Sequence, residues 1–392
     1  MAKYLFGDIV KEIKEKVDRS NNPYEYYIAG EHMDTDELHL LRRGCFEGSD
    51  VGPAFIRIFK LGQILYGSRR TYLRKVAVAD FEGVTANTTF VLESKDESIL
   101  LQRLLPFIMQ SDRFVQHSIK RSKGSTNPYV LFSDLADYEV ELPSIEKQKE
   151  LADLLWAMDS VKMSYKKLIA ATDELVKSQF IEMFGYPESN SKALPTEQLG
   201  DLAFVTKLAG FEYTKYIQYQ EKGDIIMIRG LNCKAGKLVL DDIYWINKDV
   251  SDLLPRSKLA KGDIVLTYVG TVGEVAVIDK DDTYHLAPNV AKISLLDKCK
   301  NDPLFWNYML MISKDYILRF ASTTTQSSLS MEKIRKIPFI VPDTGEQKKF
   351  VELLKQSDKS KFAALSCSNL NLSSGLVVQG VVQNMTPLIS VV

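Results

Sequence analysis

The segments PSIEKQKELADLLWAMD (143–159) and PDTGEQKKFVELLKQSD (342–358) decide the fold, because they are two copies of one pattern. They share a proline, a Gln-Lys pair, a Leu-Leu pair and an aspartate, and each shared position is separated by 199 residues. The same offset relates the Val-Ala-Val stretch at 76–78 to the one at 275–277. A repeat with this long a period indicates two copies of a whole domain rather than a solenoid of short repeats.

Both segments carry the signals of a helix that starts directly after a proline. Ser144 can cap the first helix, and Asp343 or Thr344 can cap the second. Apolar residues then recur at spacings of three and four, which places them on one face of a helix. The pattern predicts a first helix over 144–185 and a second over 343–374. The first would be about 60 Å long.

A helix of this length extends beyond a small domain, so its apolar stripe needs a partner, and the second helix offers one. The residues expected to pair the two helices are Leu151, Leu154, Leu155, Met158, Tyr165, Leu168, Leu353 and Leu354. The alternative, in which each helix packs only on its own domain, stays open.

The segments that precede the two helices mix strand-like and helix-like patterns. Residues 55–59 and 264–268 are typical of strands, and residues 100–110 and 304–312 are typical of short buried helices. The sequence therefore predicts a mixed α/β fold class. The predicted parts are a domain at 1–143, a central long helix at 144–185, a second domain at 186–342, a second long helix at 343–374 and an atypical apolar tail at 375–392.

Composition excludes several classes of protein. The chain has 392 residues with 50 Lys and Arg against 51 Asp and Glu, and this net charge of -1 excludes a uniformly basic, histone-like protein. A local basic face is still allowed, because opposite charges can segregate on a surface. The sequence contains no apolar stretch of about 20 residues and does not begin like a signal peptide, so no membrane contact and a cytoplasmic location are expected.

No metal site or catalytic site is predicted. The four cysteines lie far apart without a C-x-x-C pair, so reduced thiols are expected rather than a zinc site (Cys45, Cys233, Cys299 and Cys367). The stretch GLNCKAGK (230–237) has the wrong spacing for a phosphate-binding loop, and Asn-Pro-Tyr (127–129) lacks a proline of the amino-methyltransferase loop that it resembles. Turn chemistry explains Asn-Pro-Tyr better. His32 and His39 are interpreted as loop or surface residues.

Basic clusters offer the chemistry that the sequence does contain. Phosphate binding uses clustered cations, and base recognition uses Arg, Asn, Gln, Ser or Thr side chains. Solvated surface would explain any single cluster equally well. The candidate DNA-binding residues are Arg42, Arg43, Arg69, Arg70, Arg74, Lys75, Lys120, Arg121, Lys123, Arg229, Asn232, Lys234, Arg319 and Gln326.

Taken together, these motifs resemble the specificity subunits of type I restriction–modification systems over about residues 4 to 365. The helix entry motifs and the Gly-Thr-Val-Gly turn at 270–273 are specific in combination and weak alone. The stretches that carry the resemblance are AGEHMDTDELHLLRRG (29–44), GQILYGSRRTYLRKVAVADFEGVTANTTFVLE (62–93), LPSIEKQKELADLLWAMD (142–159), MIRGLNCKAGKLVLDD (227–242), GDIVLTYVGTVGEVAVI (262–278) and VPDTGEQKKFVELL (341–354).

The resemblance implies two target recognition domains that are separated by long antiparallel helices and related by a pseudo-two-fold repeat. Each domain would read one half of a split, asymmetric sequence in double-stranded DNA. The helices would set the gap between the half-sites and dock two methyltransferase subunits, with restriction and motor subunits joining the complex. S-adenosylmethionine would be bound only by the partner subunits, and this chain would be non-catalytic.

Two other functions stay open on the residues alone. The chain could be a self-sufficient DNA-modifying enzyme, which would transfer methyl groups without partners. It could also be a helical scaffold with no role at DNA, which would ignore DNA even when its partners are present.

Overall fold

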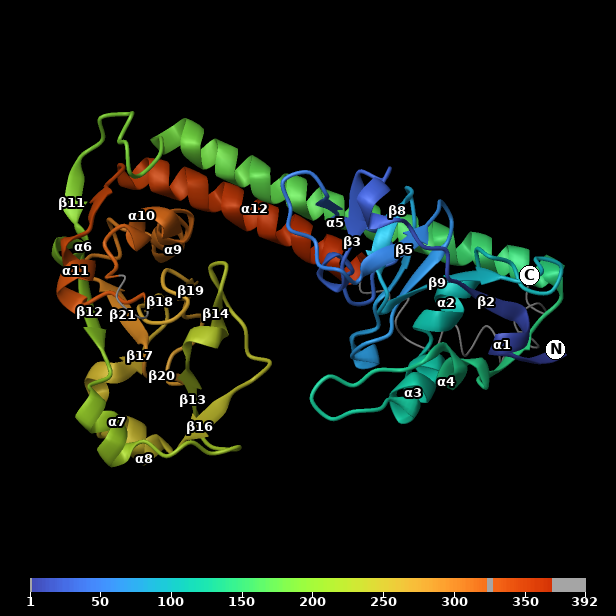
Figure 1. Ribbon diagram of the computed structural model, residues 1–392. Helices are drawn as coiled ribbons and strands as arrows, with labels where there is room; N and C mark the ends of the chain where they lie inside the picture. The colour runs from blue at the N-terminus through green and yellow to red at the C-terminus, as the bar shows by residue number, and fades with distance from the viewer. Residues whose placement is uncertain (1, 323–326, 369–392) are drawn as a thin grey trace, which may run out of the picture. The chain divides into compact units, whose positions relative to one another are not determined.

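The computed structural model describes residues 2–322 and 327–368, with side chains up to residue 361 (Figure 1). The candidate Gln326 and the apolar tail at 375–392 lie outside the described residues. The chain divides into two compact units, of which unit 1 runs from Met1 to Lys166 and unit 2 from Lys167 to Ala364.

Unit 1 is built on two four-stranded sheets with the strand orders β2-β9-β6-β7 and β4-β3-β8-β5. In the second sheet β3 runs parallel to β8, while the other pairs are antiparallel. A further antiparallel pair, β1 and β10, lies at the end that leads into the long helix. The strands are β1 (Ala2–Leu5), β2 (Val10–Ile13), β3 (Tyr26–Ile28), β4 (Gly44–Cys45), β5 (Phe55–Phe59), β6 (Ile64–Gly67), β7 (Val76–Val78), β8 (Gly83–Ala86), β9 (Thr89–Ser94) and β10 (Glu139–Leu142).

Unit 2 repeats this topology, with the orders β12-β21-β18-β19 and β16-β13-β20-β17. Here β13 runs parallel to β20, as β3 does to β8, and β11 pairs with β22 as β1 does with β10. The duplication and the mixed α/β fold class are therefore confirmed. The strands are β11 (Thr196–Gln198), β12 (Ala203–Lys207), β13 (Ile225–Ile228), β14 (Cys233–Lys234), β15 (Lys237–Leu238), β16 (Tyr244–Ile246), β17 (Lys258–Leu259), β18 (Ile264–Thr267), β19 (Val275–Val277), β20 (Tyr284–Leu286), β21 (Val290–Leu295) and β22 (Pro338–Ile340).

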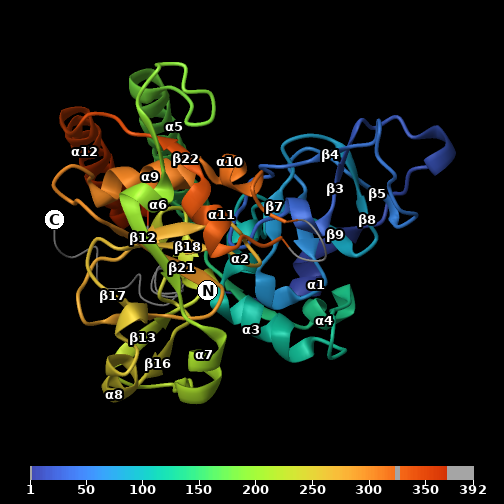
Figure 2. The same ribbon diagram turned by 90° about the vertical axis from the view of Figure 1, so that its left-hand side faces the viewer.

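Short helices cover the sheets in both units. Those of unit 1 are α1 (Phe6–Ile9), α2 (Leu105–Gln110), α3 (Asp112–Arg121) and α4 (Phe132–Ala136), and those of unit 2 are α6 (Leu199–Leu202), α7 (Gly210–Tyr216), α8 (Lys248–Asp252), α9 (Pro303–Ile312), α10 (Lys314–Leu318) and α11 (Met331–Lys336). Two long helices, α5 (Ile145–Phe184) and α12 (Thr344–Ser368), follow β10 and β22. In unit 2, α7 and α8 lie at the end opposite α12 (Figures 1 and 2).

The glutamine of the repeated motif explains why both long helices start where they do. Gln148 donates from Nε2 to the carbonyls of Ile99 and Pro143 at 2.8 and 3.1 Å, and its Oε1 accepts from Leu101 N at 3.1 Å. Its side chain therefore ties the first turn of α5 to the segment that leads into α2. Both glutamines are only 1% exposed.

Gln347 repeats this arrangement at the start of α12. Its Nε2 donates to the carbonyl of Pro342 at 2.8 Å, and its Oε1 accepts from Asp302 N at 3.1 Å. Buried polar groups are costly unless they are hydrogen-bonded, so this pairing selects one direction for each helix.

The first turns of the two helices pack on the cores of their own units. Leu151 and Leu155 belong to the core of unit 1, which corrects their predicted pairing with the second helix, and Leu353 and Leu354 pack against the core of unit 2. The core of unit 2 includes Val176, Phe180 and Phe184 of α5, so both long helices contribute to it.

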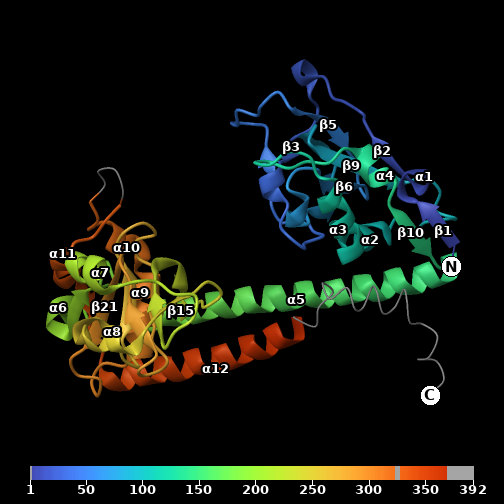
Figure 3. The ribbon, with the colours of Figure 1, turned by 90° about the horizontal axis from the view of Figure 1, so that it is seen from below.

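The two helices do meet in unit 2, through residues outside the predicted pairing set. The ring of Phe350 lies 5.1 Å from that of Phe180 and 6.0 Å from that of Phe184, and Lys361 forms an ion pair with Asp173. Figures 1 and 3 show α12 lying alongside the second half of α5. Three phenylalanines therefore supply the contact that the leucine stripe was expected to make.

The outer part of the α5 stripe is exposed, which is a second correction. Leu154 and Leu168 are 51% and 54% exposed, while Met158 and Tyr165 are half-buried. With Val161 and Leu175, at 53% and 57%, the exposed residues repeat every seven positions. We call Leu154, Val161, Leu168 and Leu175 the heptad stripe.

Within the described residues no helix has the length and apolar character needed to cross a membrane. Cys45, Cys233 and Cys299 are free thiols, and the side chain of Cys367 lies outside the described part.

Removing either buried glutamine should destabilise the unit in which that glutamine lies. Gln148→Ala and Gln347→Ala each leave buried backbone groups without a partner, so each should lower the free energy of unfolding by about 1–3 kcal/mol. Urea unfolding followed by circular dichroism measures the change. Gln356→Ala, at an exposed position of α12, is the matched control and should leave the midpoint unchanged; an equal loss in the control would contradict this role.

Candidate nucleic-acid interface

In unit 1 the structure joins two of the predicted basic segments, 68–75 and 122–130. Val130 N donates to Ser68 O at 2.9 Å, Arg70 N donates to Pro128 O at 2.6 Å, and Arg69 forms a bridge with Tyr129. Side chains add further links, because Arg70 Nε donates to Asn127 Oδ1 at 3.2 Å. The two segments form one loop pair at the end of the sheet.

This loop pair has an unusual backbone that its surroundings hold in place. Arg70 and Arg74 flank the 3-10 helix η3 (Thr71–Leu73), and both have φ of 51°, in the left-handed region that larger residues rarely adopt. The Arg74 guanidinium lies 2.6 Å from a carboxylate oxygen of both Asp36 and Asp112. Arg74 is therefore an internal anchor with a compensated charge, and its role as a DNA contact stays a prediction.

The exposed residues of the loop pair combine cations, aromatic rings and an amide. Arg69, Arg70 and Asn127 are exposed, and Tyr72 and Tyr129 are 53% and 39% exposed. We call these five residues the unit 1 loop surface. Guanidinium groups suit phosphates and guanine edges, and an amide suits adenine edges, so this surface has the chemistry of a nucleic-acid contact.

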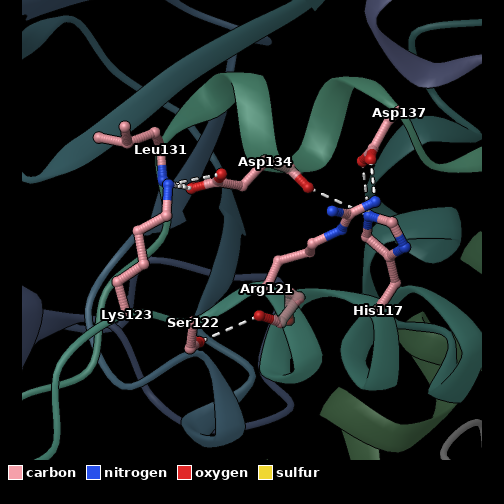
Figure 4. Close-up of polar contacts among 8 residues, drawn as sticks. His117, Arg121, Ser122, Lys123, Leu131, Asp134 and Asp137 are labelled. Atoms are coloured by element: carbon pink, nitrogen blue, oxygen red, sulfur yellow. Dashed lines mark hydrogen bonds and ion pairs between the residues drawn. The ribbon is translucent and has the colours of Figure 1, made fainter.

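The other predicted cations of this region are exposed, but several are tied to carboxylates. Figure 4 shows Arg121 paired with Asp137, which also contacts His117, and Lys123 Nζ paired with Asp134 at 2.7 Å. Burial acts to raise the pKa of Asp134, but hydrogen bonds from Lys123 and Leu131 N outweigh it and hold that pKa below its usual value. These cations can contact DNA only by leaving an internal partner.

The remaining unit 1 candidates lie in other surroundings. Lys120 is exposed at the end of α3, and Lys75 Nζ donates to the carbonyl of Gly30. Arg42 forms an ion pair with Asp34, and Arg43 lies over the ring of Tyr26 at 3.9 Å. Among the described residues, no hydrogen bond or ion pair joins Arg42 or Arg43 to the unit 1 loop surface.

Unit 2 builds the same loop pair from 268–274 and from Ser322 with residues 327–329. Leu329 N donates to Tyr268 O at 2.9 Å, as Val130 N does to Ser68 O, and Val269 bridges Ser328 as Arg69 bridges Tyr129. The positions of Arg69, Arg70 and Tyr129 are thus taken by a valine, a glycine and a serine. One backbone frame carries two different sets of side chains.

Two of the unit 2 candidates have contacts within the unit, and their role as DNA contacts stays a prediction. Asn232 is fully buried, and its amide accepts from Arg229 N and donates to the carbonyls of Val239 and Asp242. The Arg229 guanidinium is 2.9 Å from Asp242 Oδ1, lies over the ring of Tyr244 at 4.5 Å and is 18% exposed. Their charge and amide are used inside the unit.

The other described candidates of unit 2 lie on the surface. Lys234 is exposed on β14, and Arg319 pairs loosely with Glu188 at 3.5 Å.

Sequence reasoning missed Tyr129 and Asn127 as members of the loop surface, because Asn-Pro-Tyr was explained as turn chemistry. It also missed the role of His32, whose Nδ1 accepts from Ala29 N at 3.1 Å as Asn232 Oδ1 accepts from Arg229 N. The repeat offset of about 199 residues relates Tyr129 to Ser328 and His32 to Asn232, and this signal could have revealed both roles.

Within the described part of the chain, one group of side chains has the spacing of metal ligands. The ligand atoms of Glu37, His39 and Asp159 lie within 4.8 Å of one another. However, Glu37 is paired with Lys166, and Asp159 lies against His39, so each carboxylate has a basic partner of its own. His39 is also more than the loop or surface residue that was predicted, because it contacts α5.

Comparisons with known proteins agree with this geometry. Two curated relatives are type I restriction enzyme specificity subunits. MjaVIII from Methanocaldococcus jannaschii is 22% identical over 293 residues, which cover 71% of this chain and 68% of that protein. EcoBI from Escherichia coli is 25% identical over 137 residues, which cover 34% of this chain and only 29% of that protein.

Two solved structures share the fold, each at 14% sequence identity. The type I restriction–modification S subunit from M. genitalium superposes with a TM-score of 0.53 over 97% of this chain and 94% of that one. A chain from a study of assembly and conformational transition of the type I R-M system has a TM-score of 0.55, over 98% and 97%. The model of the type I restriction modification DNA specificity domain matches residues 10–172 and again 196–366, once in each repeat, so the chain belongs to this family.

Proposed function

We propose that this chain is the DNA-recognition subunit of a type I restriction–modification complex and reads a split, asymmetric target in double-stranded DNA. The observation that carries the proposal is the repeated loop frame with different side chains in units 1 and 2. Each frame would read one half-site. Because the side chains differ, the two half-sites differ in sequence.

The physical dimensions support a split target. Readers in successive major grooves of one duplex are about 34 Å apart. Helix α5 has 40 residues and is therefore about 60 Å long, which is enough to carry two readers at that spacing.

On this proposal the chemistry belongs to partner subunits. Two methyltransferase subunits would bind S-adenosylmethionine and modify the DNA, and restriction and motor subunits would complete the complex. This chain would bind no cofactor and would select the sequence. The complex would act in the cytoplasm, where the DNA of the cell lies.

The heptad stripe is the surface of this chain best suited to a methyltransferase subunit. Its four residues are each more than half exposed, and seven residues correspond to about two helical turns, so they lie along one side of α5. Exposed apolar residues in a row are typical of a protein interface.

The decisive experiment is methyl transfer in the presence and absence of partners. This chain, co-expressed with the methyltransferase encoded beside it, should methylate DNA at a split motif with two unlike halves, which sequencing of modified adenines identifies. The purified chain alone should transfer no methyl groups. Methylation by the chain alone would contradict the proposal and favour a self-sufficient enzyme, whereas no DNA binding even with partners would favour a scaffold.

Removing the exposed arginines of the unit 1 loop surface should weaken DNA binding. Arg69→Ala and Arg70→Ala should each lower affinity about tenfold, and a lost phosphate contact should reduce the slope of log affinity against log salt by about 1. Fluorescence anisotropy, with a duplex that contains the motif identified by methylation, measures the affinity and its dependence on salt. Lys60→Ala is the control, because Lys60 precedes β6 at the end away from this loop; an equal loss in Lys60→Ala would contradict the assignment.

A charge in the heptad stripe should block assembly without unfolding the chain. Leu168→Asp removes exposed apolar surface and places a charge in the interface, so it should lower methyltransferase binding at least about tenfold. Co-purification and analytical ultracentrifugation measure the complex, and circular dichroism checks the fold. Ala170→Asp, at an exposed position on the opposite side of α5, is the control; unchanged assembly of Leu168→Asp would exclude the stripe as the dock.

A further inference from the structure

In unit 1 a short acidic segment, residues 34–39, lies between the long helix and the loop pair. On the helix side, His39 Nε2 lies 2.6 Å from Asp159 Oδ2, and Lys166 Nζ lies 2.5 Å from Glu37 Oε2. Lys162 Nζ also donates to the carbonyl of Asp36 at 3.0 Å. Three residues of α5 therefore hold this one segment.

The two carboxylates of this contact are buried, while their partners His39 and Lys166 are 40% and 47% exposed. The side chains of Asp159 and Glu37 are each 2% exposed, so both carboxylates depend on the partners that the contact supplies. A buried charge that loses its partner is strongly unfavourable. The contact therefore tolerates little displacement of the segment along the helix.

The other side of the segment reaches the loop pair. The Asp36 carboxylate pairs with Arg74, the residue that anchors 68–75 and pairs again with Asp112 at the start of α3. Arg69 and Arg70 belong to the same loop. A continuous set of contacts thus runs from α5 through 34–39 to the residues proposed to contact DNA.

Unit 2 contains the same connection with different chemistry. Lys237 Nζ pairs with Asp358 of α12 at 2.9 Å, and Asp358 is the repeat equivalent of Asp159. On the loop side, Ala235 N donates to Glu274 Oε2 at 3.1 Å, and Glu274 pairs with Lys314 at the start of α10. The arginine and aspartate of unit 1 are replaced by a glutamate and a lysine, so the connection persists although its charges are reversed.

The spacing along each helix gives this contact a geometric role. Asp159 follows Gln148 by 11 residues, and Asp358 follows Gln347 by 11. Eleven residues are close to three turns, so each glutamine and aspartate lie on the same side of their helix. Two attachment points on one side fix the direction of a rod, which a single point cannot do.

We propose that Asp159, and more weakly Asp358, are positioning residues that fix each long helix against its loop pair and so set the distance at which the two half-sites are read. The inference rests on the proposed function. Asp159 is the stronger of the two because its own carboxylate is 2% exposed, although His39 is 40% exposed, whereas Lys237 and Asp358 are 65% and 40% exposed and are screened by solvent.

The contact between Asp159 and His39 responds to pH. His39 is faced by Asp159 from α5, by Glu37 from its own segment with Lys166 beside it, and by Asp80 after β7. The hydrogen bond with Asp159 raises the pKa of His39 above its ordinary value, against the opposing effect of burial. The charged pair is therefore present at low pH and is lost as pH rises through the raised pKa of His39.

The test measures discrimination between spacings rather than affinity alone. The full chain with its methyltransferase partner is titrated with a duplex of the methylated motif and with duplexes whose spacer is one base pair longer or shorter. The measured quantity is the ratio of the affinity for the original spacer to the affinity for an altered spacer. Asp159→Asn should reduce this ratio by about five- to tenfold, and Asp358→Asn by less. In the wild type the ratio should fall as pH rises through the pKa of His39, and His39→Gln should remove this pH dependence.

Asp153→Asn is the matched control, because Asp153 lies on the same helix in an exposed pair with Arg103. It should leave the ratio within about twofold of the wild type. A wild type that ignores spacing would overturn the proposed function and this inference together. The inference alone would be overturned if the wild type discriminates between spacings but Asp159→Asn and His39→Gln show the same ratio of affinities as the wild type at every pH. If Asp159→Asn does not fold, the pH dependence of the affinity ratio in His39→Gln tests the inference instead.

Discussion

The buried glutamine at the start of each long helix is the interaction on which the rest of the architecture depends. A helix that leaves a domain has no sheet to fix its direction, and its apolar face could pack in several ways. Gln148 and Gln347 remove that freedom, because each amide is satisfied only when the first turn lies against one particular loop. Buried hydrogen bonds specify one arrangement more sharply than apolar contacts do, since a shifted arrangement leaves polar groups unpaired.

The backbone frame of each loop pair is held independently of the side chains that the loops carry. The two loop pairs are held by equivalent backbone hydrogen bonds, from Val130 N to Ser68 O and from Leu329 N to Tyr268 O. Backbone bonds do not depend on which side chains the loops carry. A valine can therefore occupy the place of Arg69 without disturbing the fold, and recognition can change between repeats while the frame and its attachment to the helix stay the same.

How far the sequence could be interpreted depended on whether a signal was local or long-range. Caps and apolar periodicity are local, and α5 begins and ends within one residue of the predicted range. Exposure is long-range: Asn232 and Arg229 have the composition of a DNA contact, yet partners across their own unit bury or neutralise them. His39 was assigned to the surface for the same reason, because its partner Asp159 lies 120 residues away along the chain.

The net charge of -1 is compatible with DNA recognition once the internal ion pairs are considered. Arg121 and Lys123 already have carboxylate partners, so binding a phosphate there exchanges one ion pair for another and gains little. In the described part of the chain Arg69 and Arg70 form no ion pair with a carboxylate, and they can gain a full contact. Cations without a carboxylate partner contribute most to sequence-independent binding, so the internal pairing of the others limits affinity for arbitrary DNA and leaves selectivity to base contacts.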